Sequence, residues 1–127
     1  MDHPIDKMLS PEEIWIWLSE IFCLTEHYNY IAMNLLGVNI DKLEKIYFEE
    51  VAPVCYEFFQ PYPVDPDLTK FDETWLVESI KKRLAARKSS FLRRIAGDLY
   101  IKYLKKACAS DWQAFKKAYY SELSRKA

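Results

Sequence analysis

Apolar residues recur at helical spacing along most of this chain, and no segment alternates apolar and polar residues as a half-buried strand does. Ile14, Trp17, Leu18 and Ile21 begin this pattern. Only 2 of the 127 residues are glycine, so few positions suit the positive φ angles of tight turns. We therefore expect an all-α fold: a single compact bundle of five to seven helices over residues 10–127, after a frayed N-terminal segment, residues 1–9.

Local start signals divide the chain into helices. Residues that can cap a helix N-terminus precede the successive apolar runs: Ser10, Asn39, Asp72, Ser89 or Ser90, and Ser110. Glu13 and Gln113, each three residues after a serine, complete two capping boxes. Pro53 predicts a kink or break, because its ring would clash with the carbonyl of Glu49 in a regular helix.

The helix after Ser90 carries apolar residues at positions that share one side. These residues are Leu92, Ile95, Leu99 and Tyr103, and we expect them to form its inner face. Three other aromatic residues, Trp15, Tyr62 and Trp75, fall beside or off the predicted core stripes. Tyr and Trp combine apolar area with a polar tip and are enriched at interfaces, so exposed aromatics predict partner binding and also allow a homodimer.

Charge is distributed unevenly along the chain. Residues 1–75 contain 15 acidic and 4 basic residues, whereas residues 76–127 contain 4 acidic and 14 basic ones. Such asymmetry either neutralises itself when the halves pack together or presents charged surfaces to partners. The sequence pI near 6.1 argues against nucleic acid as the partner, since nucleic-acid-binding domains are basic overall.

Residues that carry catalysis or bind metals are sparse. His3 and His27 are the only histidines, and Cys23, Cys55 and Cys108 have no metal-ligand spacing. The cysteines are expected to be buried free thiols. Neither Glu49–Glu50 nor Asp65–Asp67 matches a cation-binding pattern. We therefore expect no enzyme activity, no catalytic residue, no cofactor and no metal.

The N-terminus has no apolar segment behind a basic start, and no run approaches the roughly 18 apolar residues of a membrane span. These features predict a cytoplasmic protein without a membrane partner.

Three segments carry a resemblance to a known group of proteins. These segments are PEEIWIWLSEIF near the N-terminus, Glu49–Pro53 (EEVAP) and Phe71–Glu78 (FDETWLVE). Through them, the chain resembles a family of small, uncharacterised, all-helical bacterial proteins. That family is similar to the immunity partners of secreted antibacterial toxins, and the resemblance covers residues 10–80. It implies no catalytic residues.

The resemblance implies that the chain binds and neutralises a cognate toxin that acts in the cytoplasm, by occluding the toxin's active site. Acidic residues could then meet a basic substrate groove, because complementary charge accelerates and directs association. The expected partner-binding residues are Glu49, Glu50, Glu57, Tyr62, Asp65, Asp67, Asp72 and Trp75.

Two other functions stay open. The chain could be an adaptor or chaperone that holds a secreted effector while the effector remains active. It could also be a regulator that binds nucleic acid through its basic C-terminal half, in which case binding would fall steeply with salt.

Overall fold

The computed structural model describes residues 9–23, 27–59 and 70–126, and every regular element in these ranges is helical. The predicted all-α fold is therefore confirmed. A short 3-10 turn, η2 (Glu20–Phe22), follows the first helix, and a π-helical turn, η3 (Tyr47–Val51), joins the third to the fourth. In chain order the α-helices are α1 (Pro11–Ser19), α2 (Tyr28–Met33), α3 (Ile40–Ile46), α4 (Ala52–Phe58), α5 (Glu73–Ser89), α6 (Phe91–Ala107) and α7 (Ala109–Lys126).

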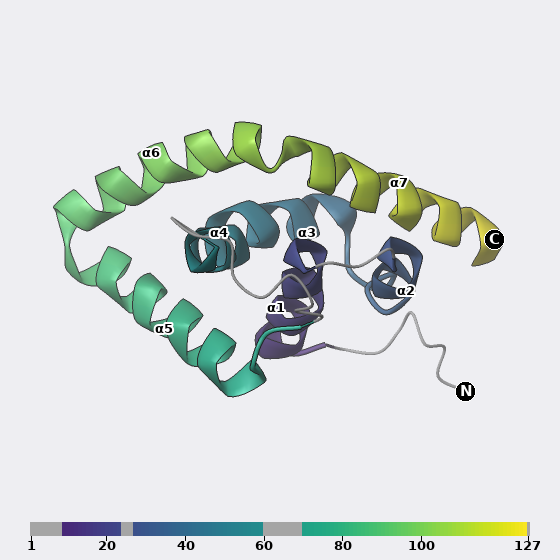
Figure 1. Cartoon of the computed structure of the whole chain (residues 1–127), viewed down its shortest axis with the longest axis horizontal. Coiled ribbons are helices and arrows are strands. Elements are labelled where there is room, and N and C mark those ends of the chain that lie inside the picture. The colour runs from purple at the N-terminus through teal and green to yellow at the C-terminus, as the bar shows by residue number, and fades with distance from the viewer. Residues whose placement is uncertain (1–8, 24–26, 60–69, 127) are drawn as a thin grey trace.

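The three long helices form a frame around the four short ones (Figure 1). Helices α6 and α7 follow one another along one edge, and α5 turns back beneath α6 to form an open angle. Helix α2 packs against α7, while α1 packs against α5 and the π-helical turn. The core lies inside the frame, and the α5–α6 hairpin extends beyond it.

Most predicted helix starts are confirmed. The Ser10–Glu13 capping box is complete, and Asn39, Asp72 and Ser90 each accept backbone N–H groups at the start of a helix. The predicted start at Ser110 is wrong, because α7 begins at Ala109. Only Cys108 separates α6 from α7, and its carbonyl accepts the N–H of Trp112, so the first backbone bond of α7 forms directly after α6 ends.

The chain passes through Pro53 without a break. A π-helical turn precedes the proline, and the N–H of Ala52 donates to the carbonyl of Tyr47, five residues earlier. This wider turn accommodates a residue that has no N–H and whose ring would crowd a regular α-helix. Of the predicted kink or break at Pro53, the break is absent, and a local change of helix type takes its place.

Aromatic rings fill the centre of the core. Tyr47 is fully buried and stacks on Phe22 and Trp112 at ring-centroid distances of 5.2 and 5.0 Å. The indole N–H of Trp112 donates to Glu44 across 3.0 Å, so an acidic side chain satisfies the polar edge of this ring. Aromatic residues make up 16% of the sequence, and packing of this kind explains much of that content.

Trp15 is buried, with 5% of its surface exposed, and the prediction that it lies off the core is wrong. Its indole Nε1 donates to Oε1 of Glu50 across 2.7 Å. Because α1 packs against both α5 and the π-helical turn, it is covered on more sides than a single apolar stripe predicts.

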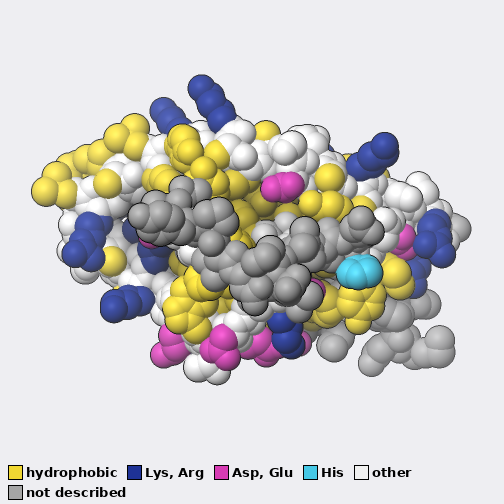
Figure 2. Space-filling view, viewed as in Figure 1, with side chains coloured by type: hydrophobic (Ala, Val, Ile, Leu, Met, Phe, Trp, Pro, Cys, Tyr) yellow, Lys and Arg dark blue, Asp and Glu magenta, His cyan; other side chains and the backbone are white. Residues whose placement is uncertain are grey.

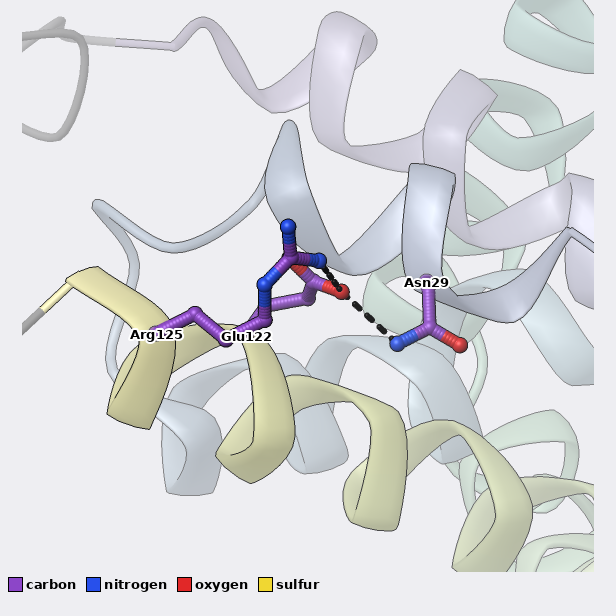
Figure 3. A network of polar contacts seen from close by, with 3 residues as sticks. All are labelled: Asn29, Glu122 and Arg125. Carbon is purple, nitrogen blue, oxygen red and sulfur yellow. Dashed lines mark hydrogen bonds and ion pairs between the residues drawn. The ribbon is translucent and has the colours of Figure 1, made fainter.

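A buried carboxylate on α7 connects this helix to α2. Glu122 on α7 is 3% exposed, accepts a hydrogen bond from Asn29 on α2 across 2.8 Å, and pairs with Arg125 at 3.1 Å (Figure 3). A buried charge needs such partners to offset the loss of water. This network ties α2 to α7.

The three cysteines are free and buried, as expected. Among the helices of the described ranges, none is both long and apolar enough to cross a membrane.

Candidate functional site

The largest set of exposed apolar side chains lies on one helix. We call this set, Phe91, Leu92, Ile95, Leu99 and Tyr103, the α6 outer face. Leu92 is 76% exposed, Phe91 65% and Leu99 62%. Figure 2 shows apolar side chains gathered along the upper left edge of the molecule, over α6. Isolated exposed leucines are ordinary, but a stripe of five large apolar residues along one helix is typical of an interaction surface.

The expectation that this stripe faces the core is wrong. The side of α6 that packs inward carries Ile101 and Leu104, which are buried, and Tyr100, which packs against the core. Apolar residues therefore occupy both sides of the helix, and hydrophobic periodicity alone cannot decide which side is covered.

Positive charges accompany the α6 outer face. Arg94, Lys102, Lys105 and Lys106 are exposed on the same helix, and the Arg94 guanidinium lies over the Phe91 ring at 5.5 Å. Asp98 is the only acidic residue of α6, and it already pairs with Arg87 on α5. The exposed side of α6 is thus both apolar and basic.

Tyr103 joins the C-terminal end of this face to the neighbouring helix α4. Its hydroxyl lies 2.9 Å from that of Tyr56, and the two rings meet edge to face at 5.8 Å. Tyr103 also stacks on Tyr100 at 6.1 Å. These contacts hold Tyr103 in place, so this aromatic anchor is ordered before any partner binds.

A pocket of about 580 Å³ opens between α5 and α6 beside the C-terminal end of α4, and we call it the α5–α6 pocket. Four basic residues line it, together with one acid, Glu57. Arg83 pairs with Glu57 at 2.8 Å and lies over the Tyr100 ring at 5.4 Å. Burial raises the pKa of Tyr100 to about 12, so its hydroxyl stays neutral. The basic lining residues are Lys82, Arg83, Arg87 and Arg93.

Arg87 is held more firmly than a surface arginine. Its side chain is 20% exposed, and one terminal nitrogen donates to Asp98 across 2.7 Å. The chain packs across Gly97, where an added Cβ would stand 3.0 Å from Nε of Arg87. That Nε is buried without a hydrogen-bond partner among the described residues. Gly97 thus gives the guanidinium room against the backbone of α6.

Three of the acidic residues predicted to bind a partner are engaged within the fold. Glu50 accepts the indole N–H of Trp15, Glu57 pairs with Arg83, and Asp72 caps α5 by accepting the N–H of Trp75. Glu49 is half-buried on the π-helical turn. The predicted residues Tyr62, Asp65 and Asp67 lie outside the described ranges.

Trp75 is 39% exposed, in agreement with its predicted place off the core stripe. Its ring packs on Phe58 at 5.1 Å and on Phe71 at 5.9 Å. It lines a smaller hollow of about 290 Å³ together with Glu57. Trp75 and Glu57 therefore lie at one site, with Asp72 at the start of the same helix, while Glu50 lies against α1.

The prediction missed the α6 outer face and the pocket beneath it. The sequence carries a signal for each: α6 has apolar residues on more than one side, and Gly97 stands inside a helix where glycine is unfavourable. Within the described parts of the chain, no three His, Cys, Asp or Glu side chains gather as metal ligands would.

A family model described as a domain of unknown function, DUF7079, matches residues 10–118. Neither a curated protein nor a solved structure matches the chain.

Proposed function

This chain belongs to the DUF7079 family, and we propose that it acts by binding a protein partner through the α6 outer face. The observation that carries the proposal is the exposure of Phe91, Leu92 and Leu99 on a helix whose opposite side is already buried. Covering apolar surface contributes about 25 cal/mol per Å² removed from water, so a stripe of five large side chains is a sizeable driving force.

The partner should present acidic and apolar groups together. Arg94, Lys102, Lys105 and Lys106 surround the stripe, so an acidic amphipathic segment would match it in both polarity and charge. A second copy of the chain fits less well, because a two-fold pairing of α6 helices would bring these cations together. A nucleic-acid backbone would engage the cations but leave Leu92 and Leu99 in water.

The resemblance to immunity proteins supports a cognate toxin as this partner, one that acts in the cytoplasm and is neutralised by occlusion of its active site. The originally expected acidic residues are less suited to this role, because Glu50, Glu57 and Asp72 already have partners within the fold. An adaptor or chaperone would use the same surface and differ in leaving the effector active.

A pull-down from native lysate with matched variants tests the proposal. Leu92→Glu with Leu99→Glu should lose a stoichiometric partner that the unaltered chain retains, because negative charge enters the apolar stripe. Leu123→Glu on α7, where Leu123 is also exposed, is the control and should retain the partner. Assays of that partner's activity, free and in complex, then separate an inhibited toxin from a carried effector.

Four outcomes would contradict the proposal. Equal capture by all three proteins would exclude the α6 outer face. If light scattering shows that the unaltered chain is a dimer with no other partner, and that the Leu92→Glu, Leu99→Glu variant is a monomer, the face would be assigned to self-association. Sedimentation with phosphatidylserine vesicles would assign it to a membrane surface. A partner lost instead on charge reversal of Glu49, Glu50 and Glu57 would return binding to the acidic residues expected from the sequence.

A further inference from the structure

We infer that the α5–α6 pocket binds a small molecule that carries phosphate groups, a role separate from protein binding on the α6 outer face. The pocket measures about 580 Å³, which lies within the usual range of roughly 300–1,000 Å³ for small-molecule sites. Its walls come from two long helices and the end of α4, so it is formed before a ligand arrives.

Charge in the pocket is unbalanced. Lys82, Arg83, Arg87 and Arg93 line it, while Glu57 and Asp98 are the acids that pair with this set. Two positive charges therefore remain, and neither Lys82 nor Arg93 pairs with a carboxylate among the described residues. A single carboxylate would neutralise half of this excess, whereas a phosphate group carries up to two negative charges and several acceptor oxygens.

The position of Arg87 indicates a prepared site rather than a solvated basic surface. Glycine in the interior of a helix is unfavourable by about 1 kcal/mol relative to alanine, yet α6 has Gly97 where the Arg87 side chain crosses it. Asp98 holds one end of the guanidinium at 2.7 Å. Because Nε is buried and one terminal nitrogen is bound to Asp98, the guanidinium plane is fixed in advance, and the other terminal nitrogen is left to donate to a phosphate oxygen.

Calorimetric titration of the full chain with pyrophosphate at low salt tests the inference, with ATP as a second probe. We expect saturable binding at one site per chain. Lys82→Gln with Arg93→Gln should weaken binding by about tenfold or more, because it removes the two unpaired cations. Lys117→Gln with Lys126→Gln removes the same charge from exposed positions on α7 and should change affinity by less than about twofold.

Arg87→Lys provides a second variant, since it keeps the charge and removes the planar guanidinium. It should also weaken pyrophosphate binding, whereas a purely electrostatic surface would not distinguish the two residues. Absence of saturable binding of either probe up to about 5 mM, a concentration well above ordinary cofactor affinities, would overturn the inference. So would equal weakening by the pocket and α7 variants, or tighter binding of a duplex oligonucleotide than of ATP. None of these results bears on capture of the protein partner, so the two proposals fail separately.

Discussion

The guanidinium of Arg87 packs against the backbone of Gly97, where a Cβ atom on residue 97 would stand 3.0 Å from Nε of Arg87. Gly97 is one of only two glycines in the chain, and it lies in the middle of α6. Glycine is unfavourable inside a helix, but at this position it leaves room for Arg87, one of the positive charges that line the α5–α6 pocket. Residues 87 and 97 lie on different helices, and the two helices meet through this contact.

Gly97→Ala should separate helix stability from pocket geometry. Alanine favours α6 by about 1 kcal/mol but displaces Arg87, so the free energy of unfolding should change by less than about 1 kcal/mol. Pyrophosphate affinity should fall, because the guanidinium leaves its position beside Asp98. Urea denaturation and calorimetry measure the two effects. A loss of stability above about 2 kcal/mol would mean that Gly97 serves backbone packing instead.

Two leucines on α6 test which side of this helix is buried. Leu104 is fully buried and Leu99 is 62% exposed, so the same substitution to alanine should have unequal effects. Leu104→Ala should lower the free energy of unfolding by about 2–5 kcal/mol, and Leu99→Ala by less than about 0.5 kcal/mol. Urea denaturation of both variants measures the two losses in the free energy of unfolding. Equal losses would indicate that the Leu99 side is covered in the isolated chain.

The Trp15–Glu50 hydrogen bond should contribute measurably to stability. Trp15→Phe removes the donor and leaves a carboxylate oxygen beside a buried ring, which costs about 1–3 kcal/mol in the free energy of unfolding. Glu50→Gln keeps an acceptor at the same place and should cost less. Chemical denaturation compares the two variants. A larger loss from Glu50→Gln would show that its negative charge, rather than the hydrogen bond, matters there.

Glu122 should hold α2 against α7. Glu122→Ala removes the acceptor of Asn29 and the partner of Arg125, and the expected loss in the free energy of unfolding is about 1–3 kcal/mol. Hydrogen exchange should accelerate most in α2, the shorter helix of the pair. Ser124→Ala, at an exposed position on α7, is the control and should leave both measurements unchanged. Uniform acceleration across the chain would argue against a local role.

The buried cysteines should resist modification and make stability depend on alkaline pH. Burial raises the pKa of Cys23 and of Cys108 from 9.0 to about 11, and it also raises the pKa of Cys55 well above its ordinary value. The unfolded chain loses these thiol protons first, so the contribution of the thiols to stability should be constant below about pH 9 and fall as pH rises toward about 11. Urea denaturation across this range and thiol labelling at pH 8 check the prediction. Fast labelling of the folded chain would contradict it.

Much of the fold follows from local sequence. The caps at Ser10, Asn39, Asp72 and Ser90 were predictable because each side chain bonds to backbone within three residues, whatever the rest of the chain does. The all-α class followed from hydrophobic periodicity, which is also a property of each segment by itself. Pro53 marked the right place, although the π-helical turn that accommodates it depends on the surrounding packing.

Tertiary structure alone decided which surfaces cover one another. Helix α6 is apolar on both sides, so its sequence permitted either side to face inward, and packing against α4, α5 and α7 selected the one with Leu104. Trp15 and Glu50 form a hydrogen bond although they lie 35 residues apart in the chain, and such a pair produces no periodic pattern in the sequence. The candidate site was missed for this reason: it consists of one side of a helix left uncovered and a pocket formed only when α5 and α6 meet.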